Sequence, residues 1–259
     1  MIRDYMRIGA RSLQRRKLRT WLTMIGIFIG IAAVVGLISL GQGMQKAIED
    51  QFAQMGTDKL TVQTKGPSYG APGSNTDLEL TISDLEVVRR SGGVDLATGR
   101  LIEPITVEFN EKEKFLYVAS LPQDAEERTM VIEVANAEDK DMIAGRSLKP
   151  SDRWKVIMSE AYLDPKFDGR GLLVGDRILI NDQPVEIVGM YKKTGNPMFD
   201  ASLVMNEDAI RDLLDMPEKN SLIIAKVNPN MDMNLVIQNI EKDLRKNRDV
   251  DEGKEDFEV

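Results

Sequence analysis

Hydrophobic and polar residues are unevenly distributed along the chain, and the sharpest change occurs at Trp21. From Trp21 to Leu40 there are twenty consecutive uncharged residues. As an α-helix that rises ~1.5 Å per residue, this segment is about 30 Å long, which is the thickness of the hydrocarbon core of a bilayer. A secretory signal has a shorter apolar core of about 7–15 residues and ends at a cleavage site with small residues. Because "SLGQGMQKA" offers no clean cleavage site, the pattern favours a retained transmembrane helix, residues 18–42. The alternatives are a cleaved signal peptide and a buried helix of a soluble protein.

The segment before this span, residues 1–17, has a pattern of its own. Four arginines recur every four residues and therefore form one stripe on a helix, with apolar side chains roughly opposite. This arrangement is typical of an amphipathic juxtamembrane helix that lies in the membrane interface. The alternative is a cluster of topogenic charges without an ordered helix. We predict that the basic residues here contact the inner leaflet, namely Arg3, Arg7, Arg11, Arg15, Arg16, Lys17 and Arg19.

The charge distribution predicts the orientation of the span. Residues 1–46 carry a net charge of +7, and the rest of the chain carries a net charge of −15. Since Lys and Arg are retained preferentially on the cytoplasmic side, the N-terminus is predicted to lie in the cytoplasm. Residues after about 42 are then extracytoplasmic, and the protein resides in the plasma membrane, with the lipid bilayer as a partner. The acidic body repels nucleic acid, so no binding of DNA or RNA is expected.

Two glycines in the span, Gly26 and Gly30, are four residues apart. Small residues at this spacing let two helix backbones approach closely, so we predict helix packing at this position. Glycine is also common in membrane helices that have no such role, and both interpretations stay open.

Beyond the span, the periodicity predicts an α+β organisation. Met44, Ile48, Phe52 and Met55 repeat at intervals of three or four residues, which predicts a stalk helix over residues 43–56. Next, "DKLTVQTK" predicts a strand, and "TISDLEVVRR" predicts a helix with Ser83 as its N-cap.

The end of the chain repeats this order of strand and helix. "SLIIAKV" predicts a strand, the following segment an amphipathic helix, and "EDFEV" a final strand. Before these elements, "ASLVMNEDAIRDLLDM" predicts a strand that leads into a helix with Asn206 as its N-cap. The apolar side of the last helix consists of Leu235, Ile237, Ile240 and Leu244. Two hairpins are expected between the ends, Ile105–Phe109 with Lys114–Ser120 and Arg177–Ile180 with Val185–Tyr191.

The elements together predict an extracytoplasmic domain with two split β-α-β halves of the ferredoxin-like type. The halves are residues 57–130 and 218–259, and a β-rich inserted subdomain, residues 131–217, separates them.

The composition removes several kinds of chemistry. The chain has no cysteine and no histidine, which excludes disulfides, thiol nucleophiles and imidazole catalysis or ligation. The motifs G-x-x-x-x-G-K-[ST] and S-x-x-K are also missing from the sequence, and the one G-x-S-x-G match, "GPSYG" at residues 66–70, has no histidine in the chain to serve as its base. We therefore expect no catalytic, cofactor-binding or metal-binding residues, and no cofactor.

Four stretches resemble, in the same order, a known family of membrane proteins. They are "ARSLQRRKLRTWLTMIGIFIGIAAVVGLISLGQGMQKAI", "MGTDKLTV", "AGRSLKPSD" and "VGDRILINDQPVEIVGMYKKTG". The first is similar to the opening of the MacB/LolC-type (FtsX-like) ABC transporter permeases, and the others to their stalk junction and core domain. The resemblance implies an N-terminal transmembrane helix and a MacB-like core domain with porter-like halves. Family permeases carry further spans after this core, so the sequence resembles their N-terminal part. Whether the chain is truncated or ends there naturally stays open.

The resemblance also implies a function and partners. The chain would be the N-terminal part of a non-catalytic permease subunit of the mechanotransmission type. Its partners would be a separate cytoplasmic ABC ATPase, a second permease protomer in a homo- or heterodimer and, in some members, an extracytoplasmic adaptor. The work would be export or extraction of a lipophilic substrate, a peptide or a lipoprotein. The alternatives are a single-span sensor or adaptor with an extracytoplasmic ligand-binding domain, and a membrane-tethered hydrolase that uses a carboxylate of raised pKa.

Overall fold

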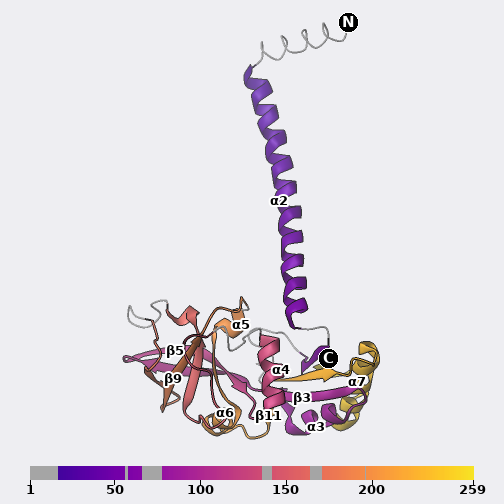
Figure 1. Cartoon of the computed structure of the whole chain (residues 1–259). Coiled ribbons are helices and arrows are strands. Elements are labelled where there is room, and N and C mark those ends of the chain that lie inside the picture. Colours follow the sequence, from indigo (N-terminus) through magenta and orange to yellow (C-terminus); the bar gives the residue numbers. More distant parts are fainter. Residues whose placement is uncertain (1–16, 56–57, 66–77, 136–141, 164–170, 196) are drawn as a thin grey trace. The chain divides into compact units, whose positions relative to one another are not determined.

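The structure is a computed structural model, and it describes residues 17–55, 58–65, 78–135, 142–163, 171–195 and 197–259 (Figure 1). Internal contacts divide the chain into two compact units, Met1–Ala53 and Gln54–Val259. The first contains one long helix. The second is an α+β domain, which agrees with the fold class expected from the sequence.

Helix α2 runs without interruption from Lys17 to Met55, so the expected span (18–42) and stalk (43–56) are parts of one helix. Its length of 39 residues corresponds to ~58 Å at ~1.5 Å per residue. Residues Trp21–Lys46 are apolar and long enough to cross a membrane. Their side chains are exposed, as a helix that contacts lipid requires. The expected amphipathic helix, residues 1–17, lies outside the described residues except for Lys17, where α2 begins.

One sheet of the domain has four strands, all antiparallel to their neighbours, in the order β13-β1-β12-β3. The strands are β1 (Lys59–Thr64), β3 (Val94–Arg100), β12 (Leu222–Val227) and β13 (Phe257–Glu258). Helix α3 (Ile82–Arg90) connects β1 to β3, and helix α7 (Met233–Arg248) connects β12 to β13. A short ladder of β2 (Leu80–Thr81) and β11 (Lys219–Asn220) lies beside it. This is the ferredoxin-like arrangement of two split β-α-β units.

Both helices cover the same face of this sheet, and their apolar side chains form one core with it. Val88 of α3 and Ile240 of α7 are fully buried there against Val62, Ile223 and Ala225. Strand side chains alternate between faces, so Leu222 and Ile224 of β12 point to the opposite face and join a different cluster.

The second sheet has seven strands in the order β6-β9-β7-β10-β5-β4-β8, and β8 also pairs with β9. That pairing closes the sheet into a six-stranded barrel, while β6 pairs with the free half of the same edge of β9. The strands are β4 (Ile102–Phe109), β5 (Lys112–Leu121), β6 (Met142–Gly145), β7 (Lys155–Ser159), β8 (Arg177–Ile180), β9 (Gln183–Tyr191) and β10 (Ser202–Asn206). The barrel interior is packed with aliphatic side chains such as Ile105, Met158 and Ile187.

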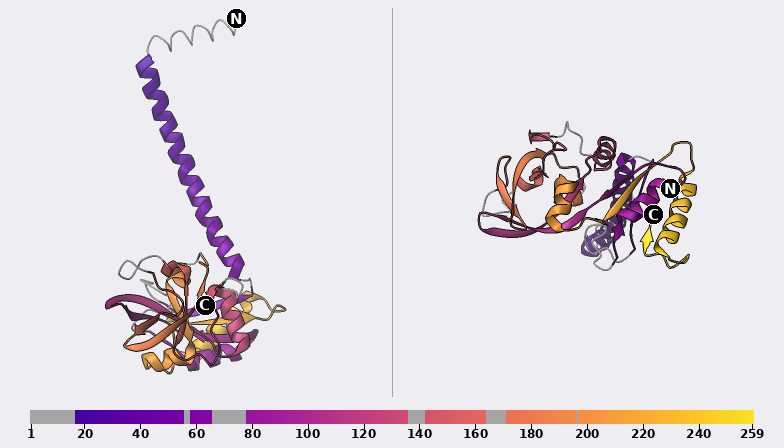
Figure 2. Two further views of the ribbon diagram at one scale, coloured as in Figure 1. Left: turned by 60° about the vertical axis from the view of Figure 1, so that its left-hand side comes forward. Right: turned by 90° about the horizontal axis from the view of Figure 1, so that it is seen from below.

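In the part of the chain that the structure describes, four short helices accompany the barrel. They are α4 (Ala125–Ala135), the 3₁₀ helix η2 (Glu160–Leu163), α5 (Pro197–Asp200) and α6 (Glu207–Leu214). Tyr162 of η2 and Ile210 of α6 contribute to the barrel core. Helix α4 lies outside the barrel, where its buried Met130 and Val131 share a cluster with Leu222 and Ile224 of the four-stranded sheet. Figure 2 gives two further views of these two adjacent parts of the domain.

The outgoing connection between the two sheets is very short, because only Leu101 separates β3 from β4. The chain returns from β10 through α6 and β11, and Ser221 lies between β11 and β12. The Ser221 amide donates to the carbonyl of Arg100 at 2.7 Å, and the Ile102 amide donates to the Ser221 hydroxyl at 2.8 Å. The Ser221 hydroxyl also donates to the buried Glu103 carboxylate at 2.8 Å, and Lys219 forms an ion pair with Glu103 at 3.1 Å. The junction is therefore held by hydrogen bonds and not by chain connectivity alone.

Both predicted hairpins are present, β4 with β5 and β8 with β9. Each turn has two residues with positive φ, Asn110 and Glu111 in the first and Asn181 and Asp182 in the second. Two such residues match the right-handed twist of the flanking strands.

Several details differ from the sequence-based expectations. Strands β4 and β5, expected in the first half (57–130), pair within the seven-stranded sheet, because the chain leaves the four-stranded sheet after Arg100. The strand β3 and the helix α4 were not predicted from the sequence. Leu235 is 47% exposed, and Val236 is buried in its place, because the face of α7 toward the sheet is rotated from the expected one.

The N-cap of α3 is Thr81 and not Ser83. The Thr81 side chain accepts a hydrogen bond from the Asp84 amide, and the Asp84 carboxylate accepts from the Thr81 amide at 2.9 Å, which forms a capping box. Ser83 lies inside the first turn, where its hydroxyl makes only a long 3.4 Å contact with Asn247.

We predict that Thr81→Ala lowers the free energy of unfolding by about 1 kcal/mol, because the first turn of α3 loses its cap. The matched control Ser83→Ala, two residues away, is expected to change it by only a few tenths of that amount. Urea denaturation of the full chain in detergent measures both. Equal destabilisation by the two variants would contradict the assignment of Thr81 as the cap.

Candidate functional site

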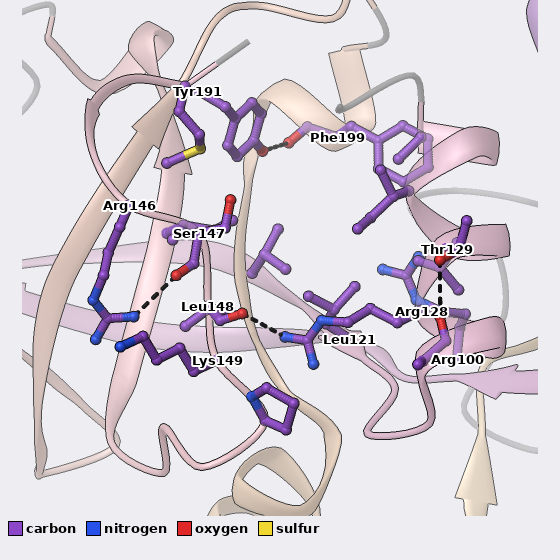
Figure 3. A pocket seen from close by; sticks show the side chains of 18 residues that line it. Arg100, Leu121, Arg128, Thr129, Arg146, Ser147, Leu148, Lys149, Tyr191 and Phe199 are labelled. Carbon is purple, nitrogen blue, oxygen red and sulfur yellow. Dashed lines mark hydrogen bonds between the residues drawn. The ribbon is translucent and has the colours of Figure 1, made fainter. Parts of the chain in front are cut away.

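A cavity of about 570 Å³ lies between α4, the segment 146–150 and the outer face of the barrel (Figure 3). This volume is within the range of sites for small molecules. The walls are mostly apolar. Leu121 of β5, Ile157 of β7 and Val204 of β10 point outward into it, because their neighbours in the strands fill the barrel core. Helix α4 supplies Val131 and Ile132 on the opposite side.

Arg100 is the basic residue buried most deeply in the wall of this cavity. It is the last residue of β3 and lies on the same face as Thr98, whose hydroxyl donates to Glu127 of α4 at 2.7 Å. Arg100 is 2% exposed, and its Nε atom has no hydrogen-bond partner among the described residues. Burial lowers the pKa of its guanidinium to about 10, although the nearby Glu207 opposes this shift. The group is therefore protonated at neutral pH.

Glu207 does not neutralise Arg100 through direct contact. Its carboxylate forms an ion pair with Arg211 at 2.7 Å, one turn further along α6. None of the ion pairs among the described residues includes Arg100. A buried cation without a counter-ion is costly, which makes Arg100 the most unusual side chain of the cavity.

Arg128 of α4 also lines the cavity, but its donors are occupied. It donates to the carbonyls of Pro122 and Leu148 at 3.0 Å each and to the Asn206 side chain at 2.9 Å. Figure 3 shows its guanidinium directed toward the Leu148 carbonyl. Arg128 thus ties α4 to the segment that forms the facing wall.

That facing wall, residues 146–152, is held in place by Asp152. Its carboxylate accepts two hydrogen bonds from Arg146, at 2.6 and 3.1 Å, and one from the Lys149 amide at 2.9 Å. The Asn206 side chain, expected as a helix cap, makes no cap hydrogen bond and instead donates to the carbonyls of Lys149 and Asp152. The hydrogen bonds from Arg146 hold the pKa of Asp152 well below its usual value, despite the opposing effect of burial.

The remaining wall is held by a hydrogen bond from a tyrosine hydroxyl. The Tyr191 hydroxyl donates to the Phe199 carbonyl at 2.9 Å, so β9 is joined to α5 (Figure 3). Burial raises the pKa of Tyr191 above its ordinary value, so the phenol is neutral at physiological pH.

Within the described residues, no group of three or more acidic side chains is placed to bind a metal ion.

The residues singled out from the sequence belong to the other unit of the chain. Arg3, Arg7, Arg11, Arg15 and Arg16 lie outside the described residues. Lys17 begins α2, and Arg19 is exposed on it. Gly26 and Gly30 lie on α2, and a Cβ atom built at either would meet nothing within 4 Å.

Sequence reasoning did not find the cavity. Arg100 ends a strand whose last four residues are buried, which is an unusual place for a charge. That signal could not be used because β3 itself was not predicted.

Comparison with known proteins places the chain in a family. The sequence profile of the MacB-like periplasmic core domain matches residues 20–243. The chain belongs to this family. The match thus covers α2 from residue 20, the barrel, and the four-stranded sheet except for β13.

The relatives of this MacB-like chain are transport proteins by name. An uncharacterized ABC transporter permease of Methanocaldococcus jannaschii is 29% identical over 257 residues, which cover 99% of this chain and 61% of the relative. The macrolide export ATP-binding/permease protein MacB of Neisseria gonorrhoeae is 27% identical over 206 residues, which cover 78% of this chain and 30% of the relative. The chain therefore spans less than two thirds of the length of either relative.

Two solved structures share the fold of this MacB-like domain. The extracellular domain of the noncanonic ABC-type transporter YknZ from Gram-positive bacteria matches with a TM-score of 0.55 and 14% identity, over 78% of this chain and 98% of that one. The periplasmic region of MacB from Actinobacillus actinomycetemcomitans matches with a TM-score of 0.55 and 16% identity, over 78% and 87%.

We predict that Asp152→Asn lowers the free energy of unfolding by about 2 kcal/mol at pH 7, because charge-assisted hydrogen bonds from Arg146 weaken. The folded-state pKa of Asp152 lies below its unfolded value of about 3.9. The stabilisation is therefore complete above about pH 4 and is lost as the pH falls through the folded-state pKa.

Urea denaturation of the full chain and the variant at several pH values measures this difference. Asp182→Asn, in the exposed β8–β9 turn, is the matched control. A difference between wild type and Asp152→Asn that stays constant from pH 7 to about pH 3 would contradict the role of the ionised carboxylate.

Proposed function

We propose that the chain is the N-terminal part of a permease subunit of an ABC transporter of the mechanotransmission type. The observation that carries the proposal is the family match over residues 20–243, which joins the apolar helix and the folded domain in one unit of homology. Its relatives in Methanocaldococcus and Neisseria carry permease names. ATP hydrolysis by a separate cytoplasmic ATPase would move the extracytoplasmic domain, for export or extraction of a lipophilic substrate, a peptide or a lipoprotein.

The form of α2 supports transmission of movement by this helix. Its 39 residues form one helix without a break at Gly41 or Gly43. Because an uninterrupted hydrogen-bond ladder is stiff, a displacement at its cytoplasmic end is passed along its length. A wide channel is not required for such a mechanism.

The proposed orientation follows from the charges. The N-terminus lies in the cytoplasm, with Arg19 and the preceding basic residues at the inner leaflet. The domain of residues 58–259 lies outside the cytoplasm, and the protein resides in the plasma membrane. The proposed partners are the ATPase, the bilayer, a second permease protomer and an extracytoplasmic adaptor. The chain itself performs no catalysis in this scheme.

A second candidate function is a single-span sensor or adaptor with a ligand-binding domain outside the cell. The cavity beneath α4 favours it, since a preformed cavity of about 570 Å³ is suited to a small ligand. The transport proposal and a ligand site are compatible in one protein.

The coupling is tested by hydrogen–deuterium exchange of the full chain in the complex with its co-purified ATPase. Exchange in residues 58–259 is expected to change when ATP is added, because the domain moves with the nucleotide state. An ATPase variant without its phosphate-binding lysine is the control and should give no change. Failure to isolate an ATPase with the chain, or identical exchange with and without ATP, would contradict the proposal.

We also propose that α2 contacts a second protomer through Gly26 and Gly30. Replacement of either glycine by Leu is expected to weaken association of the full chain by about fivefold or more, because the helices can no longer approach closely. Gly36→Leu, on another side of α2, is the matched control, since a Cβ there also meets nothing within 4 Å. Molar mass measured by light scattering in detergent reports the association, and an unchanged dimer in the Gly26 and Gly30 variants would exclude this surface.

A further inference from the structure

We propose that the cavity beneath α4 binds a small amphipathic carboxylate, with its anionic group at Arg100 and its apolar chain against the outer wall of the barrel. This site is distinct from the membrane helix and from the proposed ATPase coupling. The inference rests on the cavity alone and does not require the transport function.

The first argument is the unpaired charge of Arg100. Its side chain is 2% exposed and lines the cavity, and its Nε–H has no acceptor among the described residues. A buried donor without an acceptor and a buried charge without a counter-ion each cost free energy. An anion that enters the cavity removes both costs, and the planar guanidinium matches a carboxylate in geometry.

The second argument is the charge of the whole lining. The described lining residues include four bases, Arg100, Arg128, Arg146 and Lys149, and no acid. The donors of Arg128 are occupied by carbonyls, and Asp152 offsets the charge of Arg146, so Arg100 is the buried cation in the lining that is available to bind an anion. The field in the cavity therefore attracts an anion and repels a cation.

The third argument is the apolar character of the remaining wall. Val131, Ile132, Ile157 and Val204 present aliphatic surface between α4 and the barrel. A purely hydrophilic anion would leave this surface in contact with water. A ligand with one carboxylate and a hydrocarbon chain satisfies the guanidinium and covers the aliphatic wall at the same time.

The test uses the full chain in nanodiscs of phosphatidylcholine, with methionine methyl groups labelled by ¹³C. Octanoate is the probe, and empty nanodiscs correct for its partition into lipid. The methyl signal of Met142, which lines the cavity, is expected to shift and saturate. The signal of Met205, in the barrel core, serves as the internal reference and should remain in place.

Three variants and two analogues test how the carboxylate is recognised. Arg100→Leu is expected to weaken octanoate binding by about tenfold or more, since a charge-assisted hydrogen bond is lost. It should not lower the melting temperature, because it removes a buried unpaired charge. Arg153→Leu, an exposed arginine outside the cavity, should bind as the wild type does. Ile132→Trp keeps Arg100 but fills the cavity and should abolish the shift. Octan-1-ol and octylammonium, which lack the anion, should bind at least about tenfold more weakly than octanoate.

Three results would overturn the proposal. They are the absence of a saturable Met142 shift with octanoate, unchanged octanoate binding by Arg100→Leu, and equal binding of octanoate and octan-1-ol. None of these results depends on ATPase activity, so the ligand site and the proposed transport function can fail independently.

Discussion

The short junction between the two sheets is the constraint on which the rest of the domain depends. One residue, Leu101, carries the chain from β3 into the barrel. The chain returns from β10 through α6 and the short strand β11, and Ser221 lies directly before β12. Hydrogen bonds from Ser221 to the Arg100 carbonyl and to Glu103 fix this return against the outgoing crossing. Because the Leu101 connection has no slack and these hydrogen bonds hold the return beside it, the outer face of the barrel and one face of the four-stranded sheet are held side by side, and α4 can pack on both.

This constraint also explains the position of the cavity. Helix α4 packs through Met130 and Val131 near the junction, while its far side faces the segment held by Asp152. The space between them is closed by Arg128 on one side and by Tyr191 on the other. Arg100 enters it because it is the last residue of β3 on the face toward α4. A buried charge without a partner costs stability, and a ligand that pairs with it would recover that cost. The exposed apolar surface of α2 imposes a second, separate requirement, which lipid satisfies.

Much of the fold could be predicted from local patterns. The apolar run from Trp21, the two hairpins with paired turn residues, and the strands and helices at both ends of the domain all have strong local signals. The limit of prediction was reached where the signal is not local. Strand β3, "VDLATGR", has a glycine and few apolar residues, and it is a strand because β12 pairs along its length. Helix α4 has no clear apolar face, because only Met130 and Val131 are buried, and they pack against parts of two sheets. The candidate site could not be predicted, since Arg100, Arg128 and Asp152 are brought together only by these two elements.

The sequence by itself determined that the chain has a membrane-length helix with a basic flank, an α+β domain and no cysteine or histidine chemistry. It also carried the family resemblance. These properties reside in consecutive residues, so periodicity, charge and composition are sufficient to read them. Only the tertiary structure decided that β4 and β5 belong to the barrel, that Thr81 and not Ser83 caps α3, and that Arg100 is buried without a partner. Those outcomes depend on which distant segments compete for the same face or the same hydrogen bond, and that competition is resolved only when the chain is folded.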